Sequence, residues 1–443
     1  MGQRSFRFRI VSMLHIGIDD TDSVKGGCTT WVGTEIIAEL SEFDLICHPR
    51  LVRLNPNVPW KTRGNGAVAF TFGKGVGPKQ KIGVFQNLEI FAFEKGRDIK
   101  YDKNEVIERI SKLVSKHSYP DSQPGVVISD SFLPEGLYWQ GVTSIVSEEM
   151  LSDAIVGAST FGLRGSRGIC GAACSLAWSG NSNNMNKIPH TWELIGYRAE
   201  DKWGTNRDIS SNTVQNISNL DGVFSCNDLD GKVAMVPNSP CPVLWGFRGT
   251  KAETLIDNFQ NLGPEKPDRW LLYKTNQATD DHLCFKETSD IKDGDCVLLE
   301  VSVSSKPTTI KGGHRFFMVD DQNNQTIKCA AFEPTKNFRH TIDELDVGDS
   351  LIICGSVKNK TVNLEKIKIV ELVPRFSKPS NPVCKCGKRT HSSGKDSYYR
   401  CNDCGEKYDR PPPIEIKSGL ELKWYEPPAS ARRHLSTPIS LMG

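Results

Sequence analysis

Residues 14–30 read LHIGIDDTDSVKGGCTT, and this stretch decides the fold. Leu14, Ile16 and Ile18 alternate with smaller or polar residues, which predicts a short buried strand. The end of this strand releases three carboxylates into the following loop, those of Asp19, Asp20 and Asp22. The predicted strand therefore delivers acidic side chains to one edge of a sheet.

The residues after the carboxylates predict a helix that begins near Thr29 or Thr30. Gly26 and Gly27 give the connecting loop backbone freedom. The apolar residues that share one face of this helix are Val32, Ile36, Ile37 and Leu40. Hard carboxylate oxygens bind Mg²⁺, and free N–H groups at a helix start bind anions, so the stretch favours a site for magnesium and a polyphosphate. The alternative is an Asp/Ser-rich turn in which Thr29 is an ordinary N-cap.

The composition is that of a soluble globular protein. The chain has 443 residues, 38% hydrophobic and 24% charged, and about 150 residues per domain suggests about three domains. No apolar run reaches the roughly 18 residues that a membrane-spanning helix needs. The first twelve residues lack the apolar core of a signal peptide, and we interpret them as a short extension before Met13. Most of the 14 cysteines occur singly, which favours a reducing cytoplasm over a disulfide framework.

The net charge of +2 is unevenly distributed. Residues 1–130 carry +3, residues 131–373 carry −7 and residues 374–443 carry +6 when lysine and arginine are counted against aspartate and glutamate. A basic C-terminal module suits RNA delivery, because phosphate contacts supply most of the sequence-independent affinity for nucleic acids. A solvated tail without a partner is the alternative.

A loop rich in Asn, Pro and Gly, residues 55–66, joins two predicted strands at 47–54 and 67–72. Glycines let backbone N–H groups approach an anion, and neighbouring cations neutralise it. The candidate phosphate-positioning residues of the loop are Lys61, Arg63, Gly64, Asn65 and Gly66. A plain hairpin turn is the alternative.

From about residue 131 the pattern changes to a second α+β unit. Its predicted elements are strands at 190–197, 233–236 and 242–247 and a helix at 250–261. Residues 157–176 are rich in glycine but lack the spacing of a dinucleotide-binding fingerprint. The residues of this unit that could line a phosphate, amine or nucleotide pocket are Arg164, Arg167, Trp192, Glu193 and Arg198. For the last three, a division between core and surface is the alternative, because successive strand residues face opposite sides.

Residues 283–373 predict an OB-fold β-barrel. Its predicted elements are strands near 295–303, 314–320 and 325–332, a short helix near 340–346, and strands near 349–357 and 361–372. The position of the helix between the third and fourth strands is typical of this fold. The aromatic residues that could stack on bases are Phe316, Phe317, Phe332 and Phe338, and we expect at least half of these rings in the core.

Two pairs of cysteines after a linker at residues 374–382 predict a structural zinc ribbon. The four thiolates are those of Cys384, Cys386, Cys401 and Cys404, and tetrahedral Zn²⁺ would stabilise a unit too small to fold alone. The first pair has one intervening residue rather than two, which leaves His391 as a substitute ligand. The basic residues expected to face RNA are Lys388, Arg389, Lys395, Arg400 and Lys407. The final thirty or so residues are rich in proline and are expected to pack on other domains or to stay mobile.

Several blocks of the sequence together resemble the archaeal 2-agmatinylcytidine synthetases that modify an isoleucine tRNA. The blocks are residues 18–23 (IDDTDS), 27–30 (GCTT), 55–67 (NPNVPWKTRGNGA), 192–198 (WELIGYR), 241–249 (CPVLWGFRG) and 275–280 (TNQATD). The resemblance runs from about Met13 to about Asp409 and therefore covers most of the chain.

The resemblance implies a multidomain α+β fold. The implied units are an ATP-dependent α/β kinase-like catalytic domain at 13–130, a ferredoxin-like domain at 131–282, an OB-fold at 283–373, a zinc ribbon at 382–409 and a C-terminal tail at 410–443. It also implies a ligase that replaces the C2 oxygen of the wobble cytidine, in the CAU anticodon of an isoleucine tRNA, with agmatine. The product, 2-agmatinylcytidine, lets the tRNA read AUA.

The chemistry of this reaction explains the motifs. An amide-like oxygen is a poor leaving group, so ATP must phosphorylate it before agmatine can displace phosphate. Members of the family split ATP to AMP and two phosphates and phosphorylate the threonine that matches Thr29. The implied roles are Mg²⁺–ATP binding by Asp19, Asp20 and Asp22, phosphate acceptance by Thr29, and phosphate positioning by Gly27, Lys61, Arg63, Gly64, Asn65 and Gly66.

Two other functions use parts of the same pattern. A single-stranded nucleic-acid-binding protein without catalysis would use the predicted barrel and zinc ribbon, but it leaves the acidic strand end without a role. A metal-dependent phosphoesterase would use the aspartates, but it needs neither Thr29 nor the RNA-binding modules.

Overall fold

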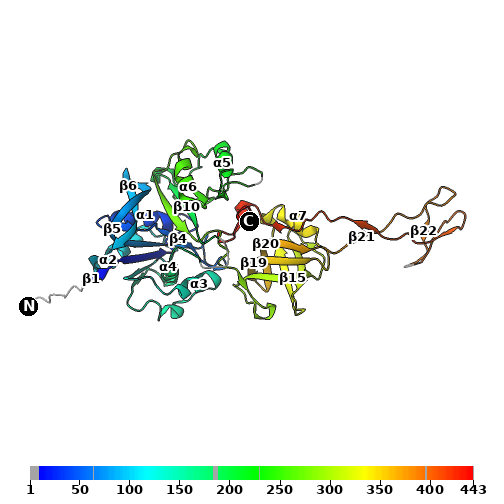
Figure 1. Ribbon diagram of the computed structural model, residues 1–443, viewed down its shortest axis with the longest axis horizontal. Helices are drawn as coiled ribbons and strands as arrows, with labels where there is room; N and C mark the ends of the chain where they lie inside the picture. The colour runs from blue at the N-terminus through cyan, green and yellow to red at the C-terminus, as the bar shows by residue number, and fades with distance from the viewer. Residues whose placement is uncertain (1–8, 63, 183–187, 229, 395–396, 443) are drawn as a thin grey trace, which may run out of the picture.

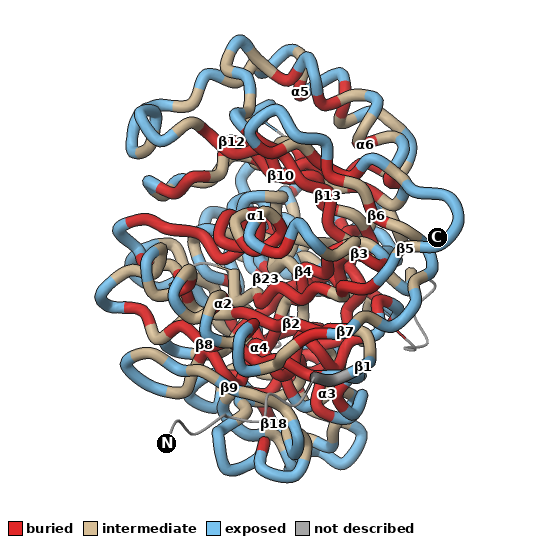
Figure 2. The backbone as a smooth tube through the Cα atoms, turned by 90° about the vertical axis from the view of Figure 1, so that its left-hand side faces the viewer, coloured by how far each residue is buried: buried red, intermediate tan, exposed pale blue. Residues whose placement is uncertain are grey.

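The computed structural model describes residues 9–62, 64–182, 188–228, 230–394 and 397–442. Figure 1 shows an elongated molecule with a large mixed α/β body at one end, a yellow β-barrel in the middle and a thin β-ribbon at the far end. The described residues thus form an α+β chain with a separate barrel, as the sequence predicts. In Figure 2 the buried stretches concentrate in the strands of the large body, and the exposed stretches lie mainly in its outer loops.

The large body is built on one sheet, which has eleven strands within the described residues. The main path runs β11-β12-β10-β13-β4-β5-β2-β8-β9, with β3 and β6 attached through β5. The bounds are β2 (Leu14–Asp19), β3 (Asp44–Ile46), β4 (Arg50–Arg53), β5 (Gly66–Phe85), β6 (Leu88–Arg97), β8 (Gly125–Ser129), β9 (Ser159–Gly162), β10 (Thr191–Tyr197), β11 (Val223–Phe224), β12 (Val243–Gly249) and β13 (Arg269–Thr275).

Helices cover both faces of this sheet (Figure 1). One hydrophobic cluster joins the sheet to α1 (Thr29–Glu39), α2 (Lys103–His117), α5 (Ser211–Ser218) and α6 (Ala252–Asn258). A second cluster, on the other face, joins it to α3 (Glu135–Thr143) and α4 (Arg167–Ala177). The helix predicted to begin near Thr29 is therefore confirmed as α1.

Strand β2 lies between β5 and β8 and pairs antiparallel with both. Leu14, Ile16 and Ile18 are fully buried, which confirms the strand predicted from their alternation. On the opposite face Gly17 lies so close to α4 that a Cβ atom there would be 3.0 Å from the carbonyl carbon of Ala172. The acidic end of β2 is consequently held in the middle of the body, with a helix directly behind it.

The sheet continues across the domain boundary expected at residue 130. Strand β9 pairs with β8, and α4 packs on β2, so elements after that boundary belong to the same layers as the first strand. Strand β13 then joins the later strands to β4 through a parallel pairing. Near the N-terminus, β1 (Arg9–Ser12) pairs with β7 (Ile99–Asp102). These first residues are interpreted from the sequence as part of an extension.

One predicted strand of the second unit is wrong. Val233 makes only an isolated bridge to Asn227, and residues 233–236 form no ladder. The backbone N–H groups of Ala234 and Met235 both donate to the carbonyl oxygen of Cys226, at 2.8 and 3.1 Å. The chain turns at this point, because two successive donors share one acceptor.

The barrel closes through five strands, whose order along the sheet is β15-β19-β20-β18-β17 and back to β15. Its elements are β15 (Cys296–Val303), β17 (Arg315–Asp320), β18 (Thr326–Ala331), α7 (Phe338–Asp343), β19 (Ser350–Lys358) and β20 (Thr361–Glu371). All neighbours are antiparallel except β18 and β20. The predicted strands and the helix between the third and fourth strands are confirmed.

The four phenylalanines of the barrel divide as expected. Phe317 and Phe338 are buried in the barrel core. Phe332 is exposed, and the half-buried ring of Phe316 meets it edge-on. Two of the rings are therefore core residues, and two remain at the barrel surface.

The last part of the chain leaves the barrel and then returns to it (Figure 1). A two-stranded ladder of β21 (Arg375–Ser377) and β25 (Ile414–Ile416) carries the ribbon outward, and the ribbon itself holds β22 (His391–Ser392), β23 (Tyr399–Arg400) and β24 (Lys407–Tyr408). Strand β26 (Trp424–Tyr425) then pairs with β20, and the C-terminus lies between the large body and the barrel. Among the described residues, no helix is both long and apolar enough to cross a membrane.

Candidate active site

The acidic end of β2 opens onto a cavity of about 570 Å³. Its walls come from several parts of the chain: the loop from β2 to α1, the loop at residues 58–66, strands β4, β10 and β12, residues 224–225 and 234–239, the start of α4, and the C-terminal segment. The sequence predicts the first two walls, whereas strands and the C-terminus complete the cavity from positions distant in the sequence.

Asp19, Asp20 and Asp22 all line this cavity. Burial raises the pKa of Asp19 well above its ordinary value, and the neighbouring Asp20 carboxylate raises it further. Burial also raises the pKa of Asp20, to about 6, although Arg167 opposes the shift. Raised carboxylate pKa values mean that the folded chain holds these negative charges at a cost, which a bound cation would remove.

The aspartates fit magnesium in one respect and not in another. Carboxylate oxygens are the ligands that Mg²⁺ prefers, and it commonly uses one or two of them together with water and substrate phosphates. The three ligand atoms do not converge tightly, however: among the described residues, the cysteines of the ribbon are the only group of three or more candidate ligands within 4.8 Å of one another. The cavity thus suits a cation shared with a phosphate rather than one enclosed by protein.

Thr29 is the first residue of α1, and the N-cap is Cys28, which makes no side-chain capping bond. The N-cap role considered for Thr29 is therefore wrong. Thr29 is only 5% exposed and lies in the cavity wall, where its hydroxyl accepts a hydrogen bond from Thr21 Oγ1 at 3.1 Å. Because Thr29 is the acceptor in that bond, its own hydroxyl hydrogen remains available to a base or a ligand at the positive end of the helix. Gly27, two residues earlier, has a φ of +76° and packs on Tyr119.

The loop at residues 61–66 faces the acidic loop. Thr62 Oγ1 donates to Asp22 Oδ2 at 3.0 Å, and Asn65 Nδ2 donates to the carbonyl oxygen of Asn55 at 3.1 Å. Lys61 lines the cavity, and burial lowers its pKa to about 8, with a further contribution from Arg433. The predicted residues Gly64, Asn65 and Gly66 also line the cavity, whereas Arg63 lies outside the described residues.

The carboxylate of Glu193, a pocket candidate from the sequence, lies in the cavity wall and contacts three lining residues that the sequence did not single out: Arg53, Arg248 and Gln277. Glu193 Oε2 lies 3.2 Å from Arg53 Nη2, and Glu193 Oε1 lies 2.9 Å from Arg248 Nε. Gln277 Nε2 also donates to Glu193. Burial raises the pKa of Glu193, but the two guanidinium groups outweigh this effect and hold it below its ordinary value. Glu193, Arg248 and Gln277 lie in the blocks that carry the family resemblance, which was the available signal.

Of the arginine candidates of the second unit, one lies in the cavity and two make contacts elsewhere. Arg167 lines the cavity, with its Nε 3.6 Å from Asp20 Oδ2. Arg164 instead donates to the carbonyl oxygens of Tyr119 and Ser122. Arg198 is 1% exposed and is occupied by Glu265, so its role is structural.

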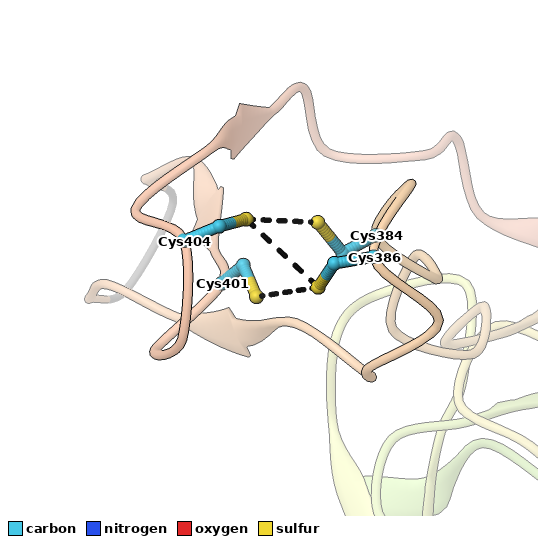
Figure 3. A group of neighbouring side chains, drawn as sticks. All are labelled: Cys384, Cys386, Cys401 and Cys404. Carbon is cyan, nitrogen blue, oxygen red and sulfur yellow. Dashed lines mark hydrogen bonds between the residues drawn. The ribbon is translucent and has the colours of Figure 1, made fainter.

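The four cysteines of the ribbon converge, as Figure 3 shows. Their Sγ atoms lie within 4.8 Å of one another, with Cys384 3.3 Å from Cys404 and Cys386 3.6 Å from Cys401. Four thiolates at this spacing fit tetrahedral zinc, which would supply the folding energy that the ribbon lacks. The close pair is compatible with this geometry because Gly387 turns the chain with a φ of +85°. His391 is outside the group.

The basic residues of the ribbon are exposed at the far end of the molecule (Figure 1). Those that the structure describes are Lys388, Arg389, Arg400 and Lys407, whereas Lys395 lies outside the described residues. The Lys407 ammonium group sits 4.5 Å from the centre of the Tyr398 ring. The basic surface of the ribbon, which contributes no residue to the cavity wall, is separate from the cavity.

An acidic strand end, a helix start and a loop with Lys61 surround one cavity and have the chemistry of a site for a phosphorylated substrate, in an α+β chain with a separate barrel and a zinc-ribbon-like cysteine cluster. The family model for the TiaS TCKD domain matches residues 15–164, that for the TiaS FLD domain residues 166–282, and that for the TiaS C-terminal zinc ribbon residues 381–419. The chain belongs to the TiaS family, the 2-agmatinylcytidine synthetases of isoleucine-2 tRNA.

Relatives and solved structures match over nearly the whole chain. The synthetase of Thermococcus sibiricus is 36% identical over 97% of this chain and 96% of its own, and that of Methanococcus voltae is 32% identical over 97% and 98%. A complex of TiaS with isoleucine-2 tRNA and ATP superposes with a TM-score of 0.81 at 32% identity, covering 97% of each chain. A complex of TiaS with the same tRNA, AMPCPP and agmatine gives 0.77 at 29% identity, again over 97% of each.

Proposed function

We propose that this chain is an ATP-dependent ligase that attaches agmatine to C2 of the wobble cytidine in the CAU anticodon of an isoleucine tRNA. The observation that carries the proposal is the single cavity in which the three aspartates, Thr29 and the loop at residues 61–66 face one another. Full-length similarity to synthetases solved with isoleucine-2 tRNA, ATP and agmatine supports the same reaction.

The reaction divides between the walls of this cavity. Lys61 and the backbone of Gly64 to Gly66 hold the ATP phosphates, and the start of α1 directs its N–H groups at them. Mg²⁺, held by one or two of the aspartates, supplies positive charge against the phosphate oxygens. Thr29 Oγ accepts a phosphoryl group and loses its proton, and the hydroxyl lies where the helix start stabilises the added charge.

The transfer of agmatine to the RNA takes two steps. The C2 oxygen of cytidine is phosphorylated, which turns it into a leaving group. The primary amine of agmatine then forms a bond to C2, the C2–O bond breaks, phosphate departs and the amine loses a proton. ATP gives up two phosphoryl groups: one goes to the C2 oxygen and departs with it as phosphate, and the other departs from Thr29 as phosphate when water hydrolyses the ester, so ATP ends as AMP and two phosphates. The cytidine must leave its stack to reach the cavity, at a cost of a few kcal/mol.

The other parts of the chain have supporting roles in this proposal. The barrel has the connectivity of an OB-fold, and the body combines the kinase-like and ferredoxin-like units that the sequence analysis divides at residue 130. The exposed cations of the ribbon (Lys388, Arg389, Arg400 and Lys407) hold tRNA phosphates. The four cysteines hold a structural zinc ion.

The test of this function is product release from ATP with each substrate omitted in turn. We expect repeated turnover of ATP to AMP only when both the tRNA and agmatine are present, because without agmatine the reaction stops at the phosphorylated cytidine. A phosphoesterase would release phosphate without agmatine, and a binding protein would leave ATP intact. Either result would contradict the proposal, whereas neither alternative explains why Thr29 lies in the cavity wall beside the aspartates.

A further inference from the structure

The C-terminal segment, residues 426–442, returns from the ribbon and enters the wall of the cavity. Arg432, Arg433 and His434 line the cavity directly. In Figure 1 the C-terminal end of the chain projects between the large body and the barrel. The sequence analysis predicts for this segment either packing on other domains or mobility, and the structure shows packing at the cavity itself.

The segment is joined by backbone hydrogen bonds to the chain that leaves the main sheet after β13. Ala278 N donates to the carbonyl oxygen of His434 at 2.9 Å, and Asp280 N donates to that of Leu435 at 2.8 Å. Thr437 Oγ1 returns a hydrogen bond to the carbonyl oxygen of Ala278 at 2.8 Å. These hydrogen bonds hold residues 433 and 434 in place at the wall of the cavity.

The barrel holds the same segment from the other side. Lys366 of β20 is 1% exposed, and its ammonium group contacts both the Asp280 carboxylate and the carbonyl oxygen of Thr437, the latter at 3.1 Å. Next to it, Glu365 Oε1 lies 3.9 Å from Arg433 Nε. The segment contacts this buried ion pair through the backbone of Thr437, whose carbonyl oxygen accepts from Lys366 and whose N–H donates to Asp280 Oδ1 at 2.8 Å.

A third attachment joins the segment to the second unit. Arg432 Nη1 donates to Ser225 Oγ at 3.1 Å, and Arg432 Nη2 pairs with Glu426 at 2.6 Å. Ser430 N donates to Asp228 Oδ1 at 2.8 Å. Three independent attachments on both sides of the cavity mean that the segment is part of the folded wall.

His434 connects the segment to the phosphate-positioning loop. Its Nδ1 lies 3.1 Å from Gln277 Oε1, and Gln277 in turn donates to Glu193. Arg53, which pairs with Glu193, donates to the carbonyl oxygen of Gly64 at 3.3 Å. Gly64 also packs against His434, which closes this ring of contacts: a Cβ atom at Gly64 would lie only 2.6 Å from His434 Nε2.

The electrostatic surroundings of His434 identify the ligand class. Burial holds the pKa of His434 well below its ordinary value, and four nearby cations lower it further: Arg53, Arg248, Lys61 and Arg433. Glu193 neutralises the first two of these cations, at the distances given above. Lys61 and Arg433 add positive charge on the loop side, and the Arg433 side chain is 39% exposed, so a ligand can reach it.

We infer that residues 426–442 are a working part of the active site: Arg433 contacts a phosphate group of a substrate, and His434 is a positioning residue that orders the loop at Gly64. This inference rests on the proposed function and assigns to it a segment from the opposite end of the chain. The phosphate group belongs either to the nucleotide or to the RNA backbone. A guanidinium group would bind a phosphate from either source in the same way.

Arg433→Ala tests the phosphate contact, with Lys417→Ala as the matched control. Lys417 is an exposed cation of the same tail that lies outside the cavity, so its removal changes net charge equally. Dissociation constants are measured for ATP without tRNA and for tRNA without ATP. We expect Arg433→Ala to weaken one of them at least fivefold, and the weakened arm identifies the source of the phosphate. Equal values for the two variants in both arms would overturn the inference.

His434→Ala tests the positioning role, and His434→Asn restores a donor toward Gln277. Hydrogen exchange of the backbone amides of residues 60–68 is the readout, because a defect confined to tail packing would leave this loop unchanged. We expect at least tenfold faster exchange in His434→Ala, a higher KM for ATP, and recovery of most of the protection in His434→Asn. Unchanged exchange in His434→Ala would overturn the positioning role.

The wild-type protein separates this inference from the function on which it rests. Wild-type protein that binds neither ATP nor tRNA would overturn the proposed function and the inference together. Wild-type protein that binds both, beside an Arg433→Ala variant equal to its control, would overturn the inference alone.

Discussion

At the scale of single residues, Thr29 combines three features that a phosphate acceptor needs. It lies at the first position of a helix, its hydroxyl accepts a hydrogen bond from Thr21, and three carboxylates share its cavity. The helix start favours negative charge at this point, and a cation held by the carboxylates would favour it further. A hydroxyl in the middle of a helix would have neither advantage.

Thr29→Ala should lower agmatine transfer at least about a hundredfold, because it removes the hydroxyl that accepts the phosphoryl group, and loss of a covalent acceptor costs more than this in well-studied enzymes. Thr29→Ser keeps the hydroxyl and should retain measurable activity. Thr29→Ala also removes the acceptor of the buried Thr21 hydroxyl and should lower the stability by about 1–3 kcal/mol, whereas Thr29→Ser keeps that acceptor. Thermal unfolding of both variants checks that they are folded at the temperature of the assay. Initial rates of agmatine incorporation are the measurement, and full transfer by Thr29→Ala would remove this residue from the mechanism.

The pKa of Lys61 leads to a prediction about the pH dependence of the reaction. Burial lowers its pKa to about 8, so the side chain is cationic below that pH and neutral above it. We expect kcat/KM for ATP to fall as pH rises through about 8, because this ratio reports groups of the free enzyme. Lys61→Arg should remove the decline, since a guanidinium group stays charged. An identical alkaline decline in Lys61→Arg would assign it to another group.

At the scale of elements, the position of Asp19 depends on how closely α4 approaches β2. Gly171 of α4 faces the Asp19 carboxylate, and a Cβ atom at this position would overlap its oxygen. Gly17 of β2 makes the same close approach from the strand side. The absence of two side chains therefore brings the helix against the acidic end of the strand.

Gly171→Ala should destabilise the fold by about 1–3 kcal/mol through overpacking, and it should reduce activity by displacing Asp19. Gly136→Ala is the matched control, because Gly136 lies in α3 with nothing within 4 Å of an added Cβ. The control should be neutral or stabilising by up to about 1 kcal/mol, as alanine favours a helix over glycine. Denaturant unfolding measures both, and equal stabilities would show that α4 has room to move.

The elements also show what the sequence could predict. Strand β2, helix α1 and the strands of the barrel follow from local periodicity, and the cysteine spacing indicates the ribbon. The contacts within the wall that contains Arg53, Glu193 and His434 could not be predicted in the same way, because its hydrogen bonds join residues that are 140 positions apart and 157 positions apart in the sequence. Glu193 is a pocket candidate from the sequence, but neither Arg53 nor His434 is. The predicted strand at 233–236 failed for a related reason: its donors bond to Cys226 instead of a neighbouring strand.

At the scale of the whole molecule, strands β4 and β10, which line the cavity, and strand β22 of the zinc ribbon lie far apart along the long axis (Figure 1). The proposed function therefore assigns nucleotide binding and RNA capture to different parts of the chain. The returning C-terminal segment is the physical link between them, since it runs from the ribbon past the barrel to the cavity.

Removal of zinc should separate the two activities. Chelation or Cys401→Ser should unfold the ribbon, because a unit this small depends on its metal. Affinity for tRNA should fall at least tenfold, whereas the dissociation constant for ATP should change less than twofold. Binding measurements with each ligand alone make the comparison, and an equal loss of both would mean that the ribbon supports the cavity instead of the RNA.

The most direct test of the central claim is nucleoside mass analysis of an isoleucine tRNA with a CAU anticodon, after incubation with ATP, Mg²⁺, labelled agmatine and the full chain. We expect a mass gain equal to agmatine less water on the wobble cytidine with wild-type protein, and none with Thr29→Ala. An unmodified cytidine after incubation with wild-type protein that binds both ATP and the tRNA would contradict the account.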